Sequence, residues 1–232
     1  MKAARLKALV WLLAGVSVIG ATGCGHYPSH LTSLRDIERT SPSETHVSVS
    51  GLRAEDFKAL SKFQNLYEID LDGGGTDSQL EALAGNGYSN LTEVVLTDCP
   101  QVTDKGVSFL LRFSTLKGLG LRGASVSDEG CHVIATRMKL QGVNLPNCPR
   151  VTANGLLALA QSETIENLGF SLDHLTQADL IKIIDGARRV NQIEVHIVGD
   201  ADKNLDLPEL RKAAHDKRIS ILGVRNHVAS SL

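Results

Sequence analysis

The sequence predicts an α/β solenoid, a stack of strand–helix units with a parallel sheet on its concave side. Two observations predict this fold class. From residue 66 onward the chain divides into five successive segments of 25, 25, 24, 25 and 25 residues. Each segment has apolar residues at its first, fourth and sixth positions, followed by a polar turn and an amphipathic run. A repeat of this length is typical of solenoids, in which each unit buries its apolar face against its neighbours.

The first part of each unit predicts a strand. In LTEVVL, residues 91–96, the apolar positions recur with a period of two. Successive side chains of a strand point to opposite faces, so we expect Val94 and Leu96 to be buried. Glu93 and Thr97 then face outward, and the outward positions of all units form one concave face.

The second part of each unit predicts a helix. In VTDKGVSFLLRF, residues 102–113, Thr103 stands at the N-cap. Asp104 follows it, where a negative charge stabilises the positive end of a helix. Val107 and Leu110 share the apolar face of this helix with Leu111. No single unit can bury that face alone, so the units must stack.

Less regular units flank the five repeats. Residues 46–65 form a shortened first unit, and residues 190–218 a longer sixth unit with an inserted loop. A last strand begins at residue 219, with no obvious cap for its free edge. We therefore expect four segments: a signal peptide, 1–23; a tether, 24–43; the repeat domain, 44–225; and a C-terminal tail, 226–232.

Two units carry a family resemblance. LTEVVLTDCPQVTDKGVSFL, residues 91–110, and LQGVNLPNCPRVTANGLLAL, residues 140–159, both have Cys-Pro after the strand and Thr-x-x-Gly at the helix start. They resemble leucine-rich repeats of the cysteine-containing subclass, and the resemblance covers roughly residues 44–225. It implies a curved solenoid that serves as a protein-binding scaffold.

The N-terminus predicts export and lipid attachment. Three basic residues precede a 13-residue apolar core, residues 8–20, which is too short to span a ~30 Å hydrocarbon layer as a helix. The following ATGC, residues 21–24, resembles the lipobox of bacterial lipoproteins. The resemblance implies that Cys24 carries fatty acyl chains such as palmitate and anchors the protein in the cell envelope. Gly25 implies the outer membrane in a Gram-negative host. An ordinary cleaved signal peptide is the alternative.

Charge and cysteine content exclude several classes of protein. Without the three basic residues of the signal, 21 basic and 26 acidic residues remain, a formal net charge of about −5. This balance does not predict a nucleic-acid partner, which requires a basic face. With Cys24 acylated, three thiols remain, so a disulfide-stapled fold is not expected. We expect Cys99, Cys131 and Cys148 to lie in the core.

One stretch has the spacing of a calcium loop. In DLDGGGTDSQLE, residues 70–81, Asp70, Asp72, Gly75 and Glu81 stand at the first, third, sixth and twelfth positions. In the repeat frame, however, both aspartates lie on the outward face of a strand. Thr76 to Gln79 fits a capping box at the start of the next helix. We therefore interpret the stretch as strand, turn and cap, and expect no metal and no cofactor.

No catalytic motif accompanies the repeats. The eight histidines are scattered without paired or helical spacing, and the chain has no Gly-x-Ser-x-Gly elbow, phosphate-binding glycine loop or His-Glu-x-x-His run. We expect a protein that is not an enzyme.

The concave face is the expected binding surface. Its first two strands are acidic, which favours a basic partner, and its middle is rich in glycine, which would let another backbone approach. We expect a membrane-anchored lipoprotein that holds a protein or peptide there. The alternative is a structural envelope protein, a spacer without a discrete ligand, and the oligomeric state is open. The expected partner-binding residues are Glu68, Asp70, Asp72, Glu93, Arg122, Asn144, Glu194 and His196.

Overall fold

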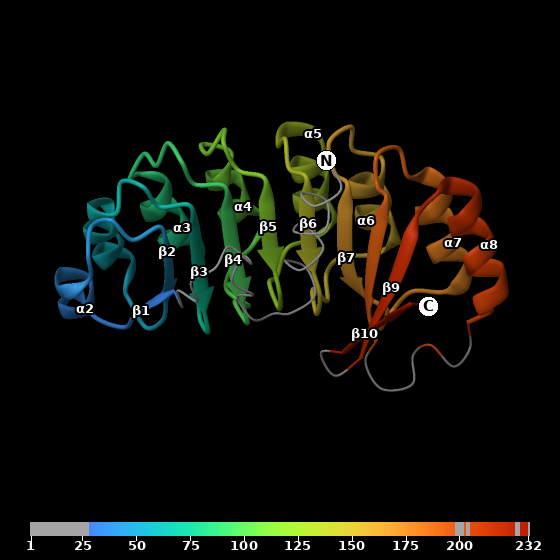
Figure 1. Ribbon diagram of the computed structural model, residues 1–232, viewed down its shortest axis with the longest axis horizontal. Coiled ribbons are helices and arrows are strands. Elements are labelled where there is room, and N and C mark those ends of the chain that lie inside the picture. The colour runs from blue at the N-terminus through green and yellow to red at the C-terminus, as the bar shows by residue number, and fades with distance from the viewer. Residues whose placement is uncertain (1–27, 198–201, 203–204, 226–227, 232) are drawn as a thin grey trace.

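The computed structural model describes residues 28–197, 202, 205–225 and 228–231. The predicted signal peptide and Cys24 lie outside the described residues, as does most of the predicted inserted loop. The described chain forms two curved layers, a sheet and a row of helices behind it (Figure 1). No helix within the described part has the length and hydropathy needed to cross a membrane.

The ten strands of the described residues belong to one sheet, in the order of the chain. β1 to β9 pair in parallel, each with the next, and β10 pairs antiparallel with β9. This arrangement confirms the predicted solenoid with its parallel sheet. The strands are β1 (Ser29–Leu31), β2 (His46–Val49), β3 (Glu68–Asp72), β4 (Glu93–Thr97), β5 (Gly118–Leu121), β6 (Gly142–Leu145), β7 (Asn167–Ser171), β8 (Gln192–His196), β9 (Ser220–Arg225) and β10 (Val228–Ser231).

One helical segment follows each of the strands from β1 to β8, which is the strand–helix alternation that the repeat predicts. The segment after β2 is a 3-10 helix, consistent with a shortened unit. The helical segments are α2 (Leu34–Arg39), η1 (Ala54–Lys62), α3 (Asp77–Ala84), α4 (Asp104–Leu110), α5 (Asp128–Arg137), α6 (Ala153–Ala160), α7 (Gln177–Gly186) and α8 (Leu207–Lys217).

The stack is longer at both ends than the sequence predicts. Residues 29–39, expected in the tether, form β1 and α2 and add a strand to the sheet. Residues 228–231, expected in the tail, form β10 and pair along the edge of β9. The expectation that β9 lacks a cap was therefore wrong, because β10 covers its edge.

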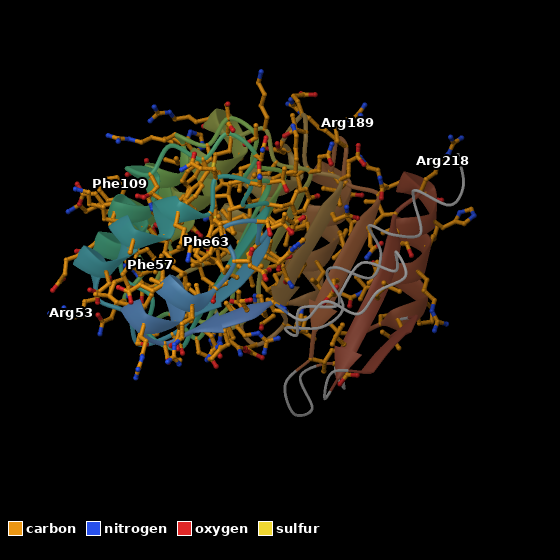
Figure 2. All side chains as sticks on the ribbon, turned by 60° about the vertical axis from the view of Figure 1, so that its left-hand side comes forward. Arg53, Phe57, Phe63, Phe109, Arg189 and Arg218 are labelled. Carbon is orange, nitrogen blue, oxygen red and sulfur yellow. The ribbon has the colours of Figure 1, made fainter. Side chains whose placement is uncertain are left out.

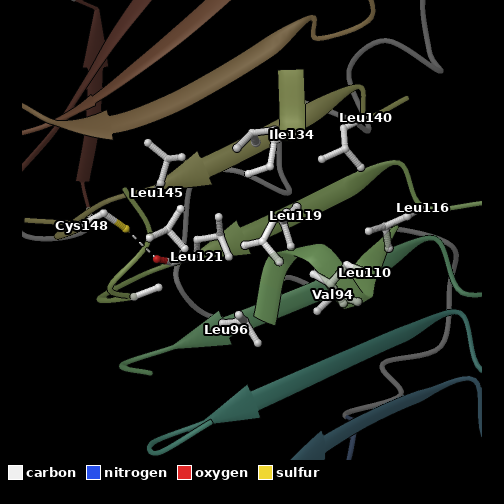
Figure 3. Close-up of a cluster of buried hydrophobic side chains, with 14 of the residues drawn as sticks. Val94, Leu96, Leu110, Leu116, Leu119, Leu121, Ile134, Leu140, Leu145 and Cys148 are labelled. Carbon is white, nitrogen blue, oxygen red and sulfur yellow. Dashed lines mark hydrogen bonds between the residues drawn. The ribbon is translucent and has the colours of Figure 1, made fainter. Parts of the chain in front are cut away.

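The core lies between the two layers. Leu119 and Leu121 of β5 pack beside the matching side chains of the neighbouring units, Val94 and Leu96 on one side (Figure 3). At the N-terminal end the core includes the fully buried Phe57 of η1 and Phe63 at the C-terminal end of η1 (Figure 2). The predicted burial of the first, fourth and sixth positions is confirmed in every full repeat: Leu66, Ile69, Leu71; Leu91, Val94, Leu96; Leu116, Leu119, Leu121; Leu140, Val143, Leu145; Ile165, Leu168, Phe170.

Aspartates at the helix starts join consecutive units. Asp104 accepts hydrogen bonds from the backbone N–H of Ser127, at 2.8 Å, and from its hydroxyl group, at 2.6 Å. Asp77 binds Thr103 in the same way, and Asp128 binds Thr152. Each aspartate therefore fixes the N-cap residue of the next helix, and this row of contacts is called the aspartate ladder below.

The Thr-x-x-Gly motif has its physical reason in this ladder. A Cβ at Gly130 would overlap the carboxylate of Asp104, and the same holds for Gly106 with Asp77 and Gly155 with Asp128. Only glycine leaves room for the aspartate of the preceding unit. The position of α6 that would continue the ladder to α7 is Ala153, and Thr176 is instead capped by Asp179 of its own helix.

Candidate functional site

The concave face presents the outward side chains of the strands in register. The residue opposite Asp70 of β3 is Val95 of β4, and the row continues through Gly120, Asn144 and Gly169 to Glu194 of β8. A second row, two residues earlier on each strand, runs from His46 to Ser220. Because all these strands are parallel and adjacent, the two rows form one continuous surface.

An acidic cluster occupies the N-terminal half of this face. It consists of Glu68, Asp70 and Asp72 of β3 and Glu93 of β4, and is called the β3–β4 acidic cluster. Glu68 lies directly opposite Glu93, and the residue is only 5% exposed. Like charges in directly opposite positions repel each other, so this arrangement costs folding free energy.

The cluster contains few compensating groups. His46 Nε2 lies 3.8 Å from Glu68 Oε2, and the Thr97 hydroxyl donates a 3.5 Å hydrogen bond to Asp70. Burial, with the neighbouring charge of Asp70, raises the pKa of Glu68 to about 7. Burial and the charge of Asp72 raise the pKa of Asp70 to about 6. Burial and the charge of Glu68 raise the pKa of Glu93 to about 8.

The glycine-rich middle of the concave face, which was expected to let another backbone approach, is only partly free of side chains. The carboxylate of Glu93 extends over Gly118, where a Cβ would meet its oxygen at 2.7 Å. In the same way the side-chain oxygen of Asn144 lies over Gly169. Gly142 is more open, because a Cβ there would meet only Asn167, at 3.9 Å. Gly118 and Gly169 therefore make room for neighbouring side chains of this chain, which was not predicted from the sequence.

A second polar group lies toward the C-terminal end of the face. It consists of Asn144 of β6, Gly169 of β7, and Gln192, Glu194 and His196 of β8, and is called the β6–β8 polar site. Glu194 is 1% exposed and Gln192 is 3% exposed. His196 Nε2 lies 2.8 Å from Glu194 Oε1 and pairs with it, whereas Glu194 Oε2, Asn144 Oδ1 and Gln192 Nε2 have no hydrogen-bond partner among the described residues. The site is thus buried and polar with incomplete pairing.

The structure does not bring the expected site residues into one place. Asp70 and Glu194 are five strand steps apart, roughly 24 Å at the usual spacing of parallel strands. Arg122 lies in the turn after β5 and belongs to neither group. Gln192 was not among the residues expected at the site, and the period-two alternation of QIEVH, which places it on the same face as Glu194, was the signal for it.

The calcium-like stretch folds as the repeat frame predicts. Asp70 and Asp72 lie on β3, Gly73 and Gly74 form the turn with positive φ, and Thr76 caps α3. The capping box is complete, because Thr76 also donates its backbone N–H to Gln79 Oε1 at 2.7 Å. Within the described ranges no three His, Cys, Asp or Glu side chains are grouped as a metal site would need.

The described cysteines are unpaired and buried, as predicted. Cys99 lies beneath the turn after β4, where its sulfur accepts from the Gly75 N–H, and Cys148 donates to the Leu121 carbonyl at 2.9 Å (Figure 3). Burial raises the pKa of Cys148 to about 12 and also raises that of Cys131. A protonated, buried thiol is a poor nucleophile and a poor metal ligand, so these residues serve packing.

A cavity of about 220 Å³ lies on the helix side of the sheet, between the last strands and α7 and α8. Its walls are mainly apolar, and Arg211 and His215 are among the lining residues. The cavity is separated from the concave face by the sheet, so it is not part of either polar group.

Comparisons with known proteins find a weak likeness to a solved structure. No protein-family model matches the chain, and no curated protein sequence matches it. Among solved structures, the chain resembles the crystal structure of the Rad7 and Elc1 complex in yeast, with 17% identity and a TM-score of 0.47. The match covers 72% of this chain and 55% of that one, so the chain spans about half of that protein's length. The fold assignment depends on the strand order and register given above.

Proposed function

We propose that the protein is a non-catalytic lipoprotein that holds a protein or peptide partner with basic side chains on its concave face. The observation that carries the proposal is the β3–β4 acidic cluster. Its carboxyl groups contribute nothing to the core between the layers, and their burial and mutual repulsion oppose folding. A basic partner would relieve both costs by supplying opposite charge.

Charge reversal tests the binding. A photo-crosslinking amino acid at Gly120, next to the cluster in the same row, should trap the partner in cells, whereas one at Lys182 on α7 should not. Replacing Asp70→Lys together with Asp72→Lys should abolish capture from Gly120 while leaving the fold intact. Equal capture by the double variant would rule out the acidic cluster as the binding surface. Equal or absent capture at Gly120 and Lys182 would favour the structural spacer instead.

The membrane anchor is a separate part of the proposal. It rests on the lipobox resemblance at Cys24, and stable anchoring needs two or more acyl chains because one chain binds only marginally. Cys24→Ser should release the protein into the soluble fraction of disrupted cells. A variant that stays with the membrane as the original does would contradict lipid attachment at this residue.

A further inference from the structure

We propose that the β6–β8 polar site binds the cationic end of a basic side chain of the protein partner. This inference rests on the proposed function, because the site lies on the same concave face. It adds a second, separate contact point that recognises one side chain.

Several polar atoms of the site are buried without a hydrogen bond in the described structure. They are Glu194 Oε2, Asn144 Oδ1 and Gln192 Nε2, whereas Glu194 Oε1 lies 2.8 Å from His196 Nε2 and pairs with it. Buried polar atoms are paired in most native structures, and those that are not call for a specific explanation. Three such atoms on neighbouring strands indicate a ligand that completes them.

The register shows why these atoms are close together. Asn144, Gly169 and Glu194 lie opposite one another on three successive strands. Since Gly169 has no side chain, Asn144 leans over it toward β8, and its oxygen comes to lie above the Gly169 backbone. Acceptor oxygens from β6 and β8 thus flank one stretch of backbone.

The chemistry of the cluster favours a cationic donor. Two of the three atoms are acceptor oxygens, and one of these belongs to a carboxylate. A guanidinium or ammonium group has several N–H donors and no acceptor, so one such group can donate to both Glu194 Oε2 and Asn144 Oδ1. Gln192 Nε2 is a donor and fits a backbone carbonyl of the same partner. Glu194 and His196 alone provide two metal ligands, fewer than a structural metal site uses.

The distance between the β6–β8 polar site and the β3–β4 acidic cluster predicts the spacing of the basic residues in the partner. Glu93 on β4 and Glu194 on β8 are four strand steps apart, roughly 19 Å. An extended chain covers about 3.3 Å per residue, so two basic residues about six positions apart would reach both carboxylates. Gly118, Gly120 and Gly142 lie on the strands between them.

The test uses the full chain, purified in detergent, and two synthetic peptides studied by isothermal titration calorimetry. One peptide has arginine at its first and seventh positions with a Gly-Ser spacer, and the other has serine in place of the second arginine. We expect the original protein to bind the two-arginine peptide about 10-fold more tightly, and Glu194→Gln to remove this advantage. Asn144→Ala should reduce it, and Glu129→Gln on the exposed start of α5 should leave it unchanged.

The outcomes separate this inference from the proposed function. If Asp70→Lys with Asp72→Lys loses peptide binding while Glu194→Gln binds both peptides as the original does, the acidic cluster is confirmed and the β6–β8 site is overturned. Equal binding of the two peptides by the original protein would overturn it as well. Circular dichroism of each variant excludes loss of fold as the cause.

Discussion

Acidic residues on the two sides of the solenoid behave differently. On the helix side, each carboxylate of the aspartate ladder accepts two hydrogen bonds from the next unit, as Asp104 does from Ser127. On the strand side, Glu93 faces Glu68 across neighbouring strands, and burial raises the pKa of both. A carboxylate is thus fully hydrogen-bonded on the helix side, whereas on the strand side it has few hydrogen-bond donors or positive charges near it. We infer that the helix-side acids stabilise the fold and the strand-side acids serve binding.

Breaking the aspartate ladder should give the largest effect. Asp104→Ala removes two hydrogen bonds to a charged acceptor and leaves the Ser127 N–H without its partner. We expect the free energy of unfolding to fall by roughly 2–4 kcal/mol, measured by urea denaturation. Asp173→Ala, at an exposed turn, is the control and should change stability by less than about 0.5 kcal/mol. An Asp104→Ala variant as stable as its control would contradict a structural role for the ladder.

A substitution that crowds the aspartate ladder should lower the free energy of unfolding by a smaller amount. In Gly130→Ala the new methyl group would overlap the Asp104 carboxylate and crowd Val126 Cγ1. We expect a net destabilisation of about 1–2 kcal/mol, because overpacking outweighs the gain of about 1 kcal/mol in helix propensity. Gly142→Ala, where a Cβ has room, should cost less. A stabilised Gly130→Ala would show that the glycine is not needed for the aspartate contact.

Removing a carboxyl group on the strand side should instead raise the free energy of unfolding. The pKa of Glu93 is raised to about 8, so the folded state holds a proton that the unfolded state releases above about pH 4.5. Stability from this group is therefore present at low pH and is lost as the pH rises through 8. Glu93→Gln should be more stable than the original by at least about 1 kcal/mol at pH 8, and the difference should be much smaller at pH 5. Thermal unfolding at both pH values measures this, and a variant less stable at pH 8 would contradict it.

The sequence predicted the repeat architecture because the apolar period is a local signal repeated many times. Positions such as Leu119 and Leu121 were assigned correctly for that reason. The inter-unit role of Asp104 was missed, because it depends on the stacking distance between helices. Its signal was present in TDKG and SDEG, residues 103–106 and 127–130, where an acid follows the cap and a glycine comes two residues later.

The candidate site was predicted only in outline. Period-two alternation correctly placed Glu68 and Glu194 on the strands' outward face, but it gave no information on burial. That Glu194 is 1% exposed and that Asn144 leans over Gly169 depend on side-chain packing across three strands. The strand at residues 29–31 was missed because three residues are too few to show a period.

The central claim is that acids on the two sides have different roles, and one measurement tests it most directly. Capture from the Gly120 crosslinker, expressed per amount of folded protein, is compared in Asp104→Asn and Glu93→Gln. The account predicts that Asp104→Asn is less stable but captures the partner as the original does, while Glu93→Gln is more stable at pH 8 and captures less. If Asp104→Asn captured less partner because it is less stable, and Glu93→Gln captured more because it is more stable, the separation of roles would be contradicted.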